Sequence, residues 1–263
     1  MSVIVSLCVI IIFMICCGGN HHKKQAKPRD TESGSIIIWI LVAVALFAAL
    51  NFAFTKGFRT GEATVSDEKA RLLATEIVDY GRTVQQAVRL LQINGCDETE
   101  VSFDQAIVSG YSNSNAPADN SCHVFNPGGG GLNWSSTALD IQDSDFSYEG
   151  LDDGYGTWLY AYPNVVDVGI NGRCELVAFL NWIPRNVCIQ INEKLGIDNP
   201  SGEPPREADW AGRQEFIGVY DISCAQISTP AGDFEGKLNG CYEGNHPNQP
   251  NGSYHFYQVL IVR

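Results

Sequence analysis

The densest group of side chains able to do chemistry is the acidic segment at residues 140–154, DIQDSDFSYEGLDDG. Its candidate calcium ligands are Asp140, Asp143, Asp145, Asp152 and Asp153, with Glu149 beside them and no Lys or Arg among them. Hard cations bind oxygen-rich loops, and calcium would offset the repulsion between the carboxylates. The spacing does not match an EF-hand loop. We therefore expect either a calcium site or a solvated acidic loop here, and no other cofactor.

Cysteines form the second group. Six of them follow residue 90: Cys96, Cys122, Cys174, Cys188, Cys224 and Cys241. None forms a CxxC pair, and no Cys/His group has the spacing of zinc ligands. An even number in a loop-rich region predicts up to three disulfides in an oxidising compartment. Of the possible pairings we predict the one in sequence order, because each pair then closes a short loop beside a regular element: 96 with 122, 174 with 188, and 224 with 241.

Signatures of catalysis are missing from the sequence. It contains no HExxH or GxSxG motif and no nucleotide-binding fingerprint. The histidines His123, His246 and His255 stand apart from other candidate ligands, and the glycine run 128–131 lacks the Lys-Ser/Thr of a phosphate loop. We expect that the chain is not an enzyme and that the glycine run is a flexible connection.

Charge argues against one class of partner. The chain has a formal net charge of -13. No Lys or Arg occurs between Leu90 and Gly172, a region rich in Asp and Glu. Nucleic acid is therefore not an expected partner, since phosphate binding requires positive charge.

An apolar segment, Ile36 to Phe54, must position everything that follows it. Asn51 is its only polar residue. As a helix it would be ~28 Å long, close to the thickness of the hydrocarbon core of a bilayer. We predict a transmembrane helix over 35–56 rather than a buried core helix, and the run is too long for the apolar part of a cleaved signal peptide.

A shorter apolar segment, Val3 to Cys17, lies within residues 1–34. It is either a second membrane helix or the result of a misassigned start, because translation from Met14 would leave a polar leader. Lys23, Lys24, Lys27 and Arg29 precede the predicted span and favour a cytoplasmic location for that side. Together with the cysteines, this predicts a single-pass protein whose later domain lies outside the cytoplasmic membrane.

The elements after the span indicate an α+β domain. A hinge at 55–64, with Gly57 and Gly61, precedes an expected amphipathic helix starting near Ser66. The helix stripe is Leu73, Ile77, Val84, Val88 and Leu91, and Asn94-Gly95 ends it. Strands are expected around 157–162, 165–170, 174–183, 215–224 and 253–262, with a helix from Pro184 to Gly196. We predict a long N-terminal helix, membrane-spanning and then amphipathic over 57–93, packed on an antiparallel, disulfide-stapled sheet within a β-rich domain over 94–263.

In these features the chain resembles the type IV pilins and type II secretion pseudopilins. The resemblance rests on a basic polar leader, the Gly34-Ser35 junction, the uncut apolar run and the amphipathic helix, at about residues 23 to 93. It implies cleavage after Gly34 by a prepilin peptidase, so that Ser35 becomes the first residue. It also implies a C-terminal disulfide loop, where Cys224 and Cys241 would fit. The family's usual Glu at mature position five is replaced here by Trp39.

The resemblance implies a structural role. The chain would be a minor pilin or pseudopilin anchored in the bacterial inner membrane, with its C-terminal domain periplasmic or extracellular. Its partners would be the lipid bilayer, other pilin-like subunits of an envelope filament or secretion system, and the prepilin peptidase. The alternative is a signal-anchored binding or sensor domain without a filament role.

Overall fold

The structure is a computed structural model of the whole chain. The residues that it describes are 33–104, 110–134, 141–143, 155, 157–170, 172–207, 209, 214–221, 223–228 and 233–263. Within the long helix, the described side chains are those of residues 40, 42–47 and 66–93. The chain divides into two compact units, Met1–Arg59 and Thr60–Arg263, and each is described by itself.

Helix α2 runs without a break over Ser33–Ile93. The break in the helix expected at 55–64 is wrong, because these residues are helical and Ser66 does not begin a new helix; the division between the two units nevertheless falls within this stretch. A Gly inside a helix costs about 1 kcal/mol relative to Ala. Gly57 and Gly61 thus lower the stability of this stretch without supplying a signal that ends it. Within the described part of the chain, no helix has the combined length and apolar character of a membrane span.

The later part of α2 supplies one wall of the core of the second unit. The side chains buried along it are Ala70, Ala74, Ile77, Val78, Val84, Ala87, Val88 and Leu91. They include four of the five residues of the predicted stripe, and the fifth, Leu73, packs against the same core. The predicted stop is also confirmed: the helix ends at Ile93, and Gly95 takes a left-handed φ of 100°. This amphipathic half of the helix could be read from the sequence because its period is local.

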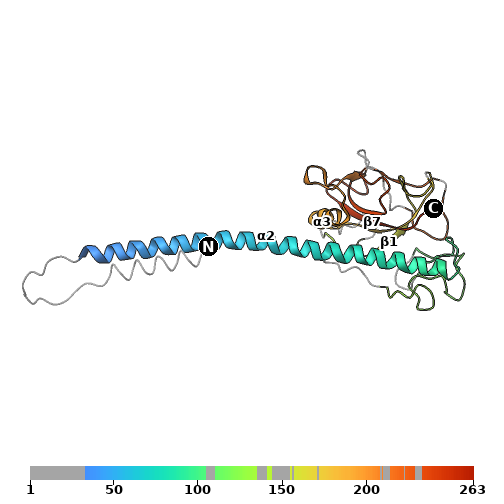
Figure 1. Cartoon of the computed structure of the whole chain (residues 1–263), viewed down its shortest axis with the longest axis horizontal. Helices are drawn as coiled ribbons and strands as arrows, with labels where there is room; N and C mark the ends of the chain where they lie inside the picture. The colour runs from blue at the N-terminus through green and yellow to red at the C-terminus, as the bar shows by residue number, and fades with distance from the viewer. Residues whose placement is uncertain are drawn as a thin grey trace, which may run out of the picture. The chain divides into compact units, whose positions relative to one another are not determined.

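A five-stranded sheet packs against α2 (Figure 1). The strands are β1 (Leu159–Ala161), β2 (Asn164–Val165), β3 (Leu176–Leu180), β4 (Arg206–Glu207), β5 (Gln226–Ile227), β6 (Asn239–Gly244) and β7 (Tyr254–Ile261). The large sheet has the order β1-β3-β7-β6-β4, and all neighbours are antiparallel except β4 and β6. Strands β2 and β5 form a separate parallel pair. The fold is α+β with an antiparallel-rich sheet, as predicted.

Both faces of the large sheet are buried, which explains why β7 is buried at every position. Phe256 and Leu260 belong to the core cluster that includes α2, whereas Tyr257 and Val259 belong to a second cluster with Val165 and other residues of the connecting segments. Alternate residues of a strand point to opposite faces. The strand expected around 253–262 is therefore confirmed, and both of its faces are buried.

Helix α2 lies close to the sheet at Gly81. A Cβ at this position would lie 3.2 Å from Phe256 Cε1 and 3.3 Å from Gln258 Cβ. One turn later, Gln85 Nε2 donates a hydrogen bond of 2.7 Å to the Val259 carbonyl oxygen. The absence of a side chain at Gly81 lets the helix lie directly on β7.

Helix α3 (Arg185–Leu195) follows β3 as predicted. Pro184 precedes its first residue, and Gly196 ends it in the left-handed conformation with φ of 69°. A short 3₁₀ helix, η3 (Pro200–Gly202), comes next. In Figure 1, α3 lies at the edge of the domain beside β7.

The strand expected over 215–224 is wrong in the described part of that segment. Glu215 makes one isolated bridge with Ala161, and residues 217–221 form bends and irregular structure. Gly218 has φ of 85°, which a continuous strand does not accommodate. The apolar-rich pattern EFIGVYDISC was typical of a strand, but its central glycine turns the chain away.

The glycine run 128–131 is an ordered turn and not the flexible connection that was expected. Gly129 N–H donates to the Asn126 carbonyl and Gly130 N–H to the His123 carbonyl, both at 2.9 Å. A Cβ at either glycine would collide with backbone atoms of 120–124. Glycine is required here because two stretches of backbone pass in direct contact.

All six cysteines after residue 90 are in disulfides, but only one predicted pair is correct. The bonds are Cys96–Cys122, Cys174–Cys224 and Cys188–Cys241. The predicted pairs of 174 with 188 and of 224 with 241 are wrong. The reason is β6, a strand that was not predicted: it is buried and α3 packs on it, so Cys188 of the helix meets Cys241 of the strand.

Candidate functional site

The predicted calcium ligands lie mostly outside the described residues. Asp140, Asp145, Asp152 and Asp153 are among those not described. Asp143 is described, and its backbone N–H donates to the Trp182 carbonyl oxygen at 2.6 Å. Where residues are described, no group of three Asp, Glu, His or Cys side chains could hold a metal ion. The calcium site stays a prediction.

The predicted processing site lies at the start of α2. Gly34 and Ser35 follow Ser33, the first residue of the helix, and the backbone of both is helical. The described apolar side chains that come next are all exposed within the chain. The exposed fractions of the large side chains range from 45% for Val42 to 66% for Leu46 and Phe47. Exposed residues follow one another without a gap from Val42 to Phe47, so apolar side chains surround this part of the helix.

A chain of buried polar groups joins the ends of β3 and β7. Ser253 Oγ lies 2.8 Å from His255 Nε2, and His255 Nδ1 lies 3.0 Å from Asn181 Oδ1. This is the order of a nucleophile, a base and an orienting residue. However, all three residues are fully buried, and the Ser253 hydroxyl donates its proton to the Pro250 carbonyl at 2.6 Å. Burial also lowers the pKa of His255 to about 3. We conclude that a neutral histidine here links two strand ends inside the core.

Sequence reasoning missed this chain because it considered His255 alone. Ser253 and His255 are two positions apart and therefore on one face of the strand, which is a signal that could have been used. Asn181 comes from a segment 74 positions earlier, and only the pairing of β3 with β7 brings it there.

A second polar group holds α3 to the open edge of β6. The Asn192 amide is fully buried, accepts a hydrogen bond of 2.9 Å from Cys241 N–H and donates one of 2.8 Å to the Cys241 carbonyl. It replaces a neighbouring strand at this point, because β4 pairs with β6 only at Glu243 and Gly244. The helix is thus fastened to Cys241 twice, by this amide and by the disulfide from Cys188.

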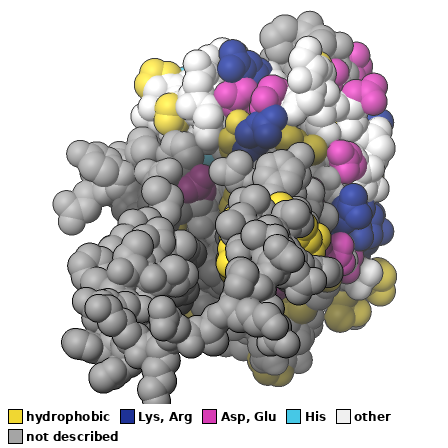
Figure 2. Space-filling view, turned by 90° about the vertical axis from the view of Figure 1, so that its left-hand side faces the viewer, with side chains coloured by type: hydrophobic (Ala, Val, Ile, Leu, Met, Phe, Trp, Pro, Cys, Tyr) yellow, Lys and Arg dark blue, Asp and Glu magenta, His cyan; other side chains and the backbone are white. Residues whose placement is uncertain are grey.

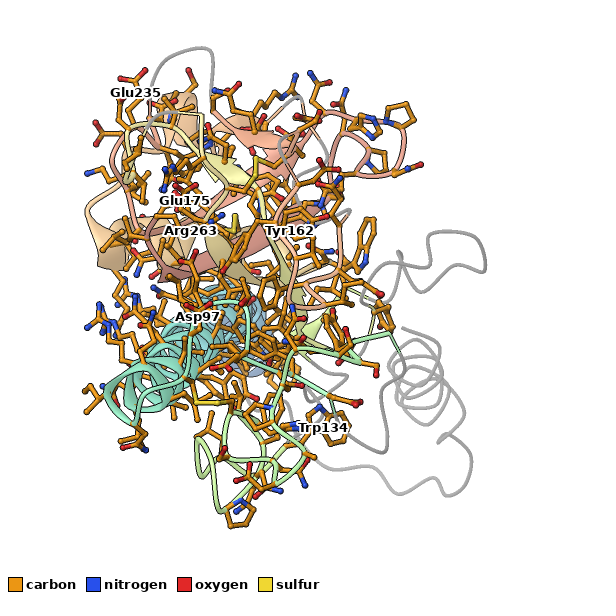
Figure 3. The ribbon with its side chains drawn as sticks, turned by 90° about the vertical axis from the view of Figure 1, so that its right-hand side faces the viewer. Asp97, Trp134, Tyr162, Glu175, Glu235 and Arg263 are labelled. Carbon is orange, nitrogen blue, oxygen red and sulfur yellow. A yellow bond between two sulfur atoms is a disulfide. The ribbon has the colours of Figure 1, made fainter. Side chains whose placement is uncertain are left out.

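The third polar group surrounds Arg263, two residues after β7. Its Nε donates to Glu98 Oε1 at 2.8 Å, and its guanidinium carbon lies 3.7 Å from the centre of the Tyr220 ring. Glu175 is fully buried nearby, and its labelled side chain lies next to that of Arg263 in Figure 3. Burial raises the pKa of Glu175 to about 7, although a hydrogen bond from Val165 N–H and the charge of Arg263 act in the opposite direction. Burial also raises the pKa of Tyr220, so its hydroxyl stays protonated.

A polar cavity of about 480 Å³ opens beside the Cys174–Cys224 disulfide. Its lining residues are Asn164, Val166, Asp167, Gly172, Ser223, Cys224 and Gln226. Among the lining residues that the structure describes, Asp167 is the only one with a charged side chain. The cavity could accept a small polar molecule, and nothing in its lining commits it to one class.

Some charges on the described surface form ion pairs. Arg185 forms an ion pair with Glu203, and Arg206 forms one with Glu243. Figure 2 shows basic and acidic side chains lying side by side on the described part of one face.

Comparison with known proteins gave no match to a family model, to a curated protein or to a solved structure.

Proposed function

We propose that this chain is a membrane-anchored, pilin-like structural subunit, a minor pilin or pseudopilin of a bacterial envelope filament or secretion system. One observation carries the proposal: α2 is a single helix over Ser33–Ile93 that bears an apolar segment first and the core-forming face of a sheet domain later. This order of parts is the one on which the resemblance rests.

The surface of the early helix supports a role in lipid or between helices. The side chains of Val42, Val44, Leu46 and Phe47 are each at least 45% exposed in the isolated chain. Burial of apolar surface is worth about 25 cal/mol per Å², so a helix that is apolar on all sides gains most from an environment that covers it completely. A bilayer provides this before assembly, and neighbouring helices provide it in a filament.

The location follows from the same proposal. The basic leader would stay in the cytoplasm and the sheet domain would lie in the periplasm or outside the cell. The three disulfides of that domain agree with an oxidising compartment. The partners would be the bilayer, other pilin-like subunits and the prepilin peptidase, without a cofactor of the chain's own.

The cavity beside Cys224 favours a second candidate, a signal-anchored binding or sensor domain. Its volume of about 480 Å³ and its polar lining suit a small polar ligand. Such a protein would keep its leader and would need no filament partners.

Processing distinguishes the two candidates. The full chain should be expressed in cells with an active prepilin peptidase, and its amino terminus determined by mass spectrometry or Edman degradation. The pilin-like role predicts Ser35 as the first residue, and substitution of Gly34 by Leu should prevent the cut. Gly19→Leu, in the same leader, is the matched control and should be processed normally. An intact leader in the unmodified chain would contradict the proposal.

Membrane anchoring is tested separately. Ala45→Arg places a charge in the centre of the apolar segment and should impair insertion, at a cost of about 2.5–3.5 kcal/mol on insertion scales. Gln86→Arg, on an exposed position of the later helix, is the control and should not. Equal recovery of both variants in the membrane fraction would remove the basis for the anchor.

A further inference from the structure

Two polar atoms are buried without a hydrogen-bond partner in the described part of the chain: Glu175 Oε1 and the Tyr220 hydroxyl. Buried polar groups in proteins are almost always paired, so each exception needs an explanation. Both atoms belong to the group of side chains around Arg263, which acts electrostatically on Glu175 and on Tyr220. Their common position suggests one cause.

Glu175 is held in place at every point except Oε1. Its backbone N–H donates to the Pro163 carbonyl at 2.8 Å, and its Oε2 accepts a hydrogen bond of 2.7 Å from Val165 N–H. It also follows Cys174, which the disulfide to Cys224 fixes. The carboxyl group therefore cannot move to solvent without disturbing β2, and its Oε1 atom is left without a hydrogen-bond partner.

Arg263 is the cation that could serve as this donor. Its ion pair is with Glu98, a half-buried residue in the turn after α2. One guanidinium nitrogen also approaches the Cys174 carbonyl at 3.4 Å, directly before Glu175 in the chain. The same guanidinium thus reaches from the turn after the helix to the residue adjoining the buried carboxyl.

We propose that Arg263 changes its ion-pair partner from Glu98 to Glu175 when Glu175 loses its proton. While Glu175 is protonated, Arg263 pairs with Glu98 and covers the Tyr220 ring. When Glu175 releases its proton to solvent, the guanidinium turns to Oε1 and Glu98 loses its partner. The proposal does not depend on the proposed function.

The driving force is the cost of a buried, unpaired carboxylate, which exceeds the value of a partly exposed ion pair. The pKa of Glu175, raised by burial to about 7, places the exchange close to neutral pH. The Tyr220 hydroxyl is a second buried group without a partner on which Glu175 acts electrostatically, and burial raises the pKa of that phenol and keeps it protonated.

Other charged groups face this site from the surrounding segments. They are Asp97 and Glu98 from the turn after α2, which act on Tyr220, and Asp221, which follows Tyr220 in the chain and acts on the neighbouring Tyr162. Strands β2 and β3 contribute no titratable side chain. Acids therefore outnumber bases around Arg263. Whether Arg263 pairs with Glu98 or with Glu175, the other carboxylate must be solvated, and Glu98 is the more exposed of these two residues.

The consequence is a link between pH and the junction of α2 with the sheet domain. The ion pair of Glu98 with Arg263 connects the turn after α2 to the segment after β7, and this connection is lost when Arg263 moves to Glu175. Hydrogen bonds of Asp97 with Thr99 and Glu100 would then hold the turn alone.

Nuclear magnetic resonance of the full chain in detergent micelles tests the exchange. The Nε–Hε signal of Arg263 and the side-chain carboxyl carbons of Glu175 and Glu98 should be followed from pH 5 to pH 9. We expect the Arg263 signal to shift with the same midpoint as Glu175, near neutral pH. Glu175→Gln, which resembles the protonated side chain in shape and charge, should hold Arg263 at its low-pH position throughout.

Glu98→Gln is the matched variant. It removes the competing partner, so Arg263 should bind Glu175 more readily and the Glu175 midpoint should move to lower pH. Overturning results would be an Arg263 signal that does not change in the unmodified chain, or one that titrates equally in Glu175→Gln. If Glu175→Gln failed to fold, an unchanged midpoint of Glu175 in Glu98→Gln would refute the proposal by itself.

Discussion

Replacement of Asn192 by Ala should lower the stability of the domain more than the loss of an ordinary hydrogen bond. Asn192 bonds both the N–H and the carbonyl of Cys241 at the open edge of β6, and Cys241 is fully buried. Alanine would leave both backbone groups without a partner. A buried group left unpaired costs about 1–3 kcal/mol, so we expect a loss of about 4 kcal/mol in the free energy of unfolding.

Urea unfolding of the full chain in detergent micelles, with its disulfides intact, measures this loss from the midpoint and the m-value. Asn199→Ala is the control. It removes the hydrogen bond of 2.9 Å between the two asparagine side chains but leaves the contacts with Cys241, and should cost about 1 kcal/mol. The reasoning is refuted if Asn192→Ala stays within about 1 kcal/mol of Asn199→Ala, since the edge of β6 would then not depend on the amide.

Three further predictions concern other parts of the domain. Peptide mapping without reduction should find Cys188 joined to Cys241. Replacing both by Ala should lower the free energy of unfolding by about 4 kcal/mol, because the bond spans 53 positions. A loss under about 1 kcal/mol would contradict a stabilising role of this bond. Gly218→Ala should cost at least about 2 kcal/mol more than Gly252→Ala in urea unfolding, since both glycines have positive φ but a Cβ collides with a neighbouring side chain only at Gly218. The free energy of unfolding should fall as pH rises from about 4.5 to about 7, because the folded chain keeps the Glu175 proton that the unfolded chain has lost. Glu175 contributes a slope of at most about 1.4 kcal/mol per pH unit, and Glu175→Gln should remove this contribution.

Part of the fold could be predicted because its signals are local. The apolar residues Ile77, Val84, Val88 and Leu91 recur at the helical period, and each is buried where the period places it. Pro184 and Gly196 bound α3 because proline and glycine restrict or permit backbone angles at their own positions. The number of cysteines beyond residue 90 likewise indicated three disulfides. The helix signals belong to segments of fewer than about twenty residues, and the cysteine count needs no knowledge of which segments meet.

The rest depends on which segments meet, and this is decided by the tertiary structure. Strand β6 carries few signals of its own, yet it lies between β7 and β4 and brings Cys241 to α3, which changed two of three predicted disulfides. Glu98 and Arg263 are 165 positions apart, and Asn181 and His255 are 74 apart. No local pattern records such pairs, because the contact energy arises only after the sheet has ordered its strands. The sequence by itself determined the apolar stripe and the end of α2, the bounds of α3, the charge and the number of disulfides, whereas packing of the sheet against α2 and α3 decided the disulfide partners.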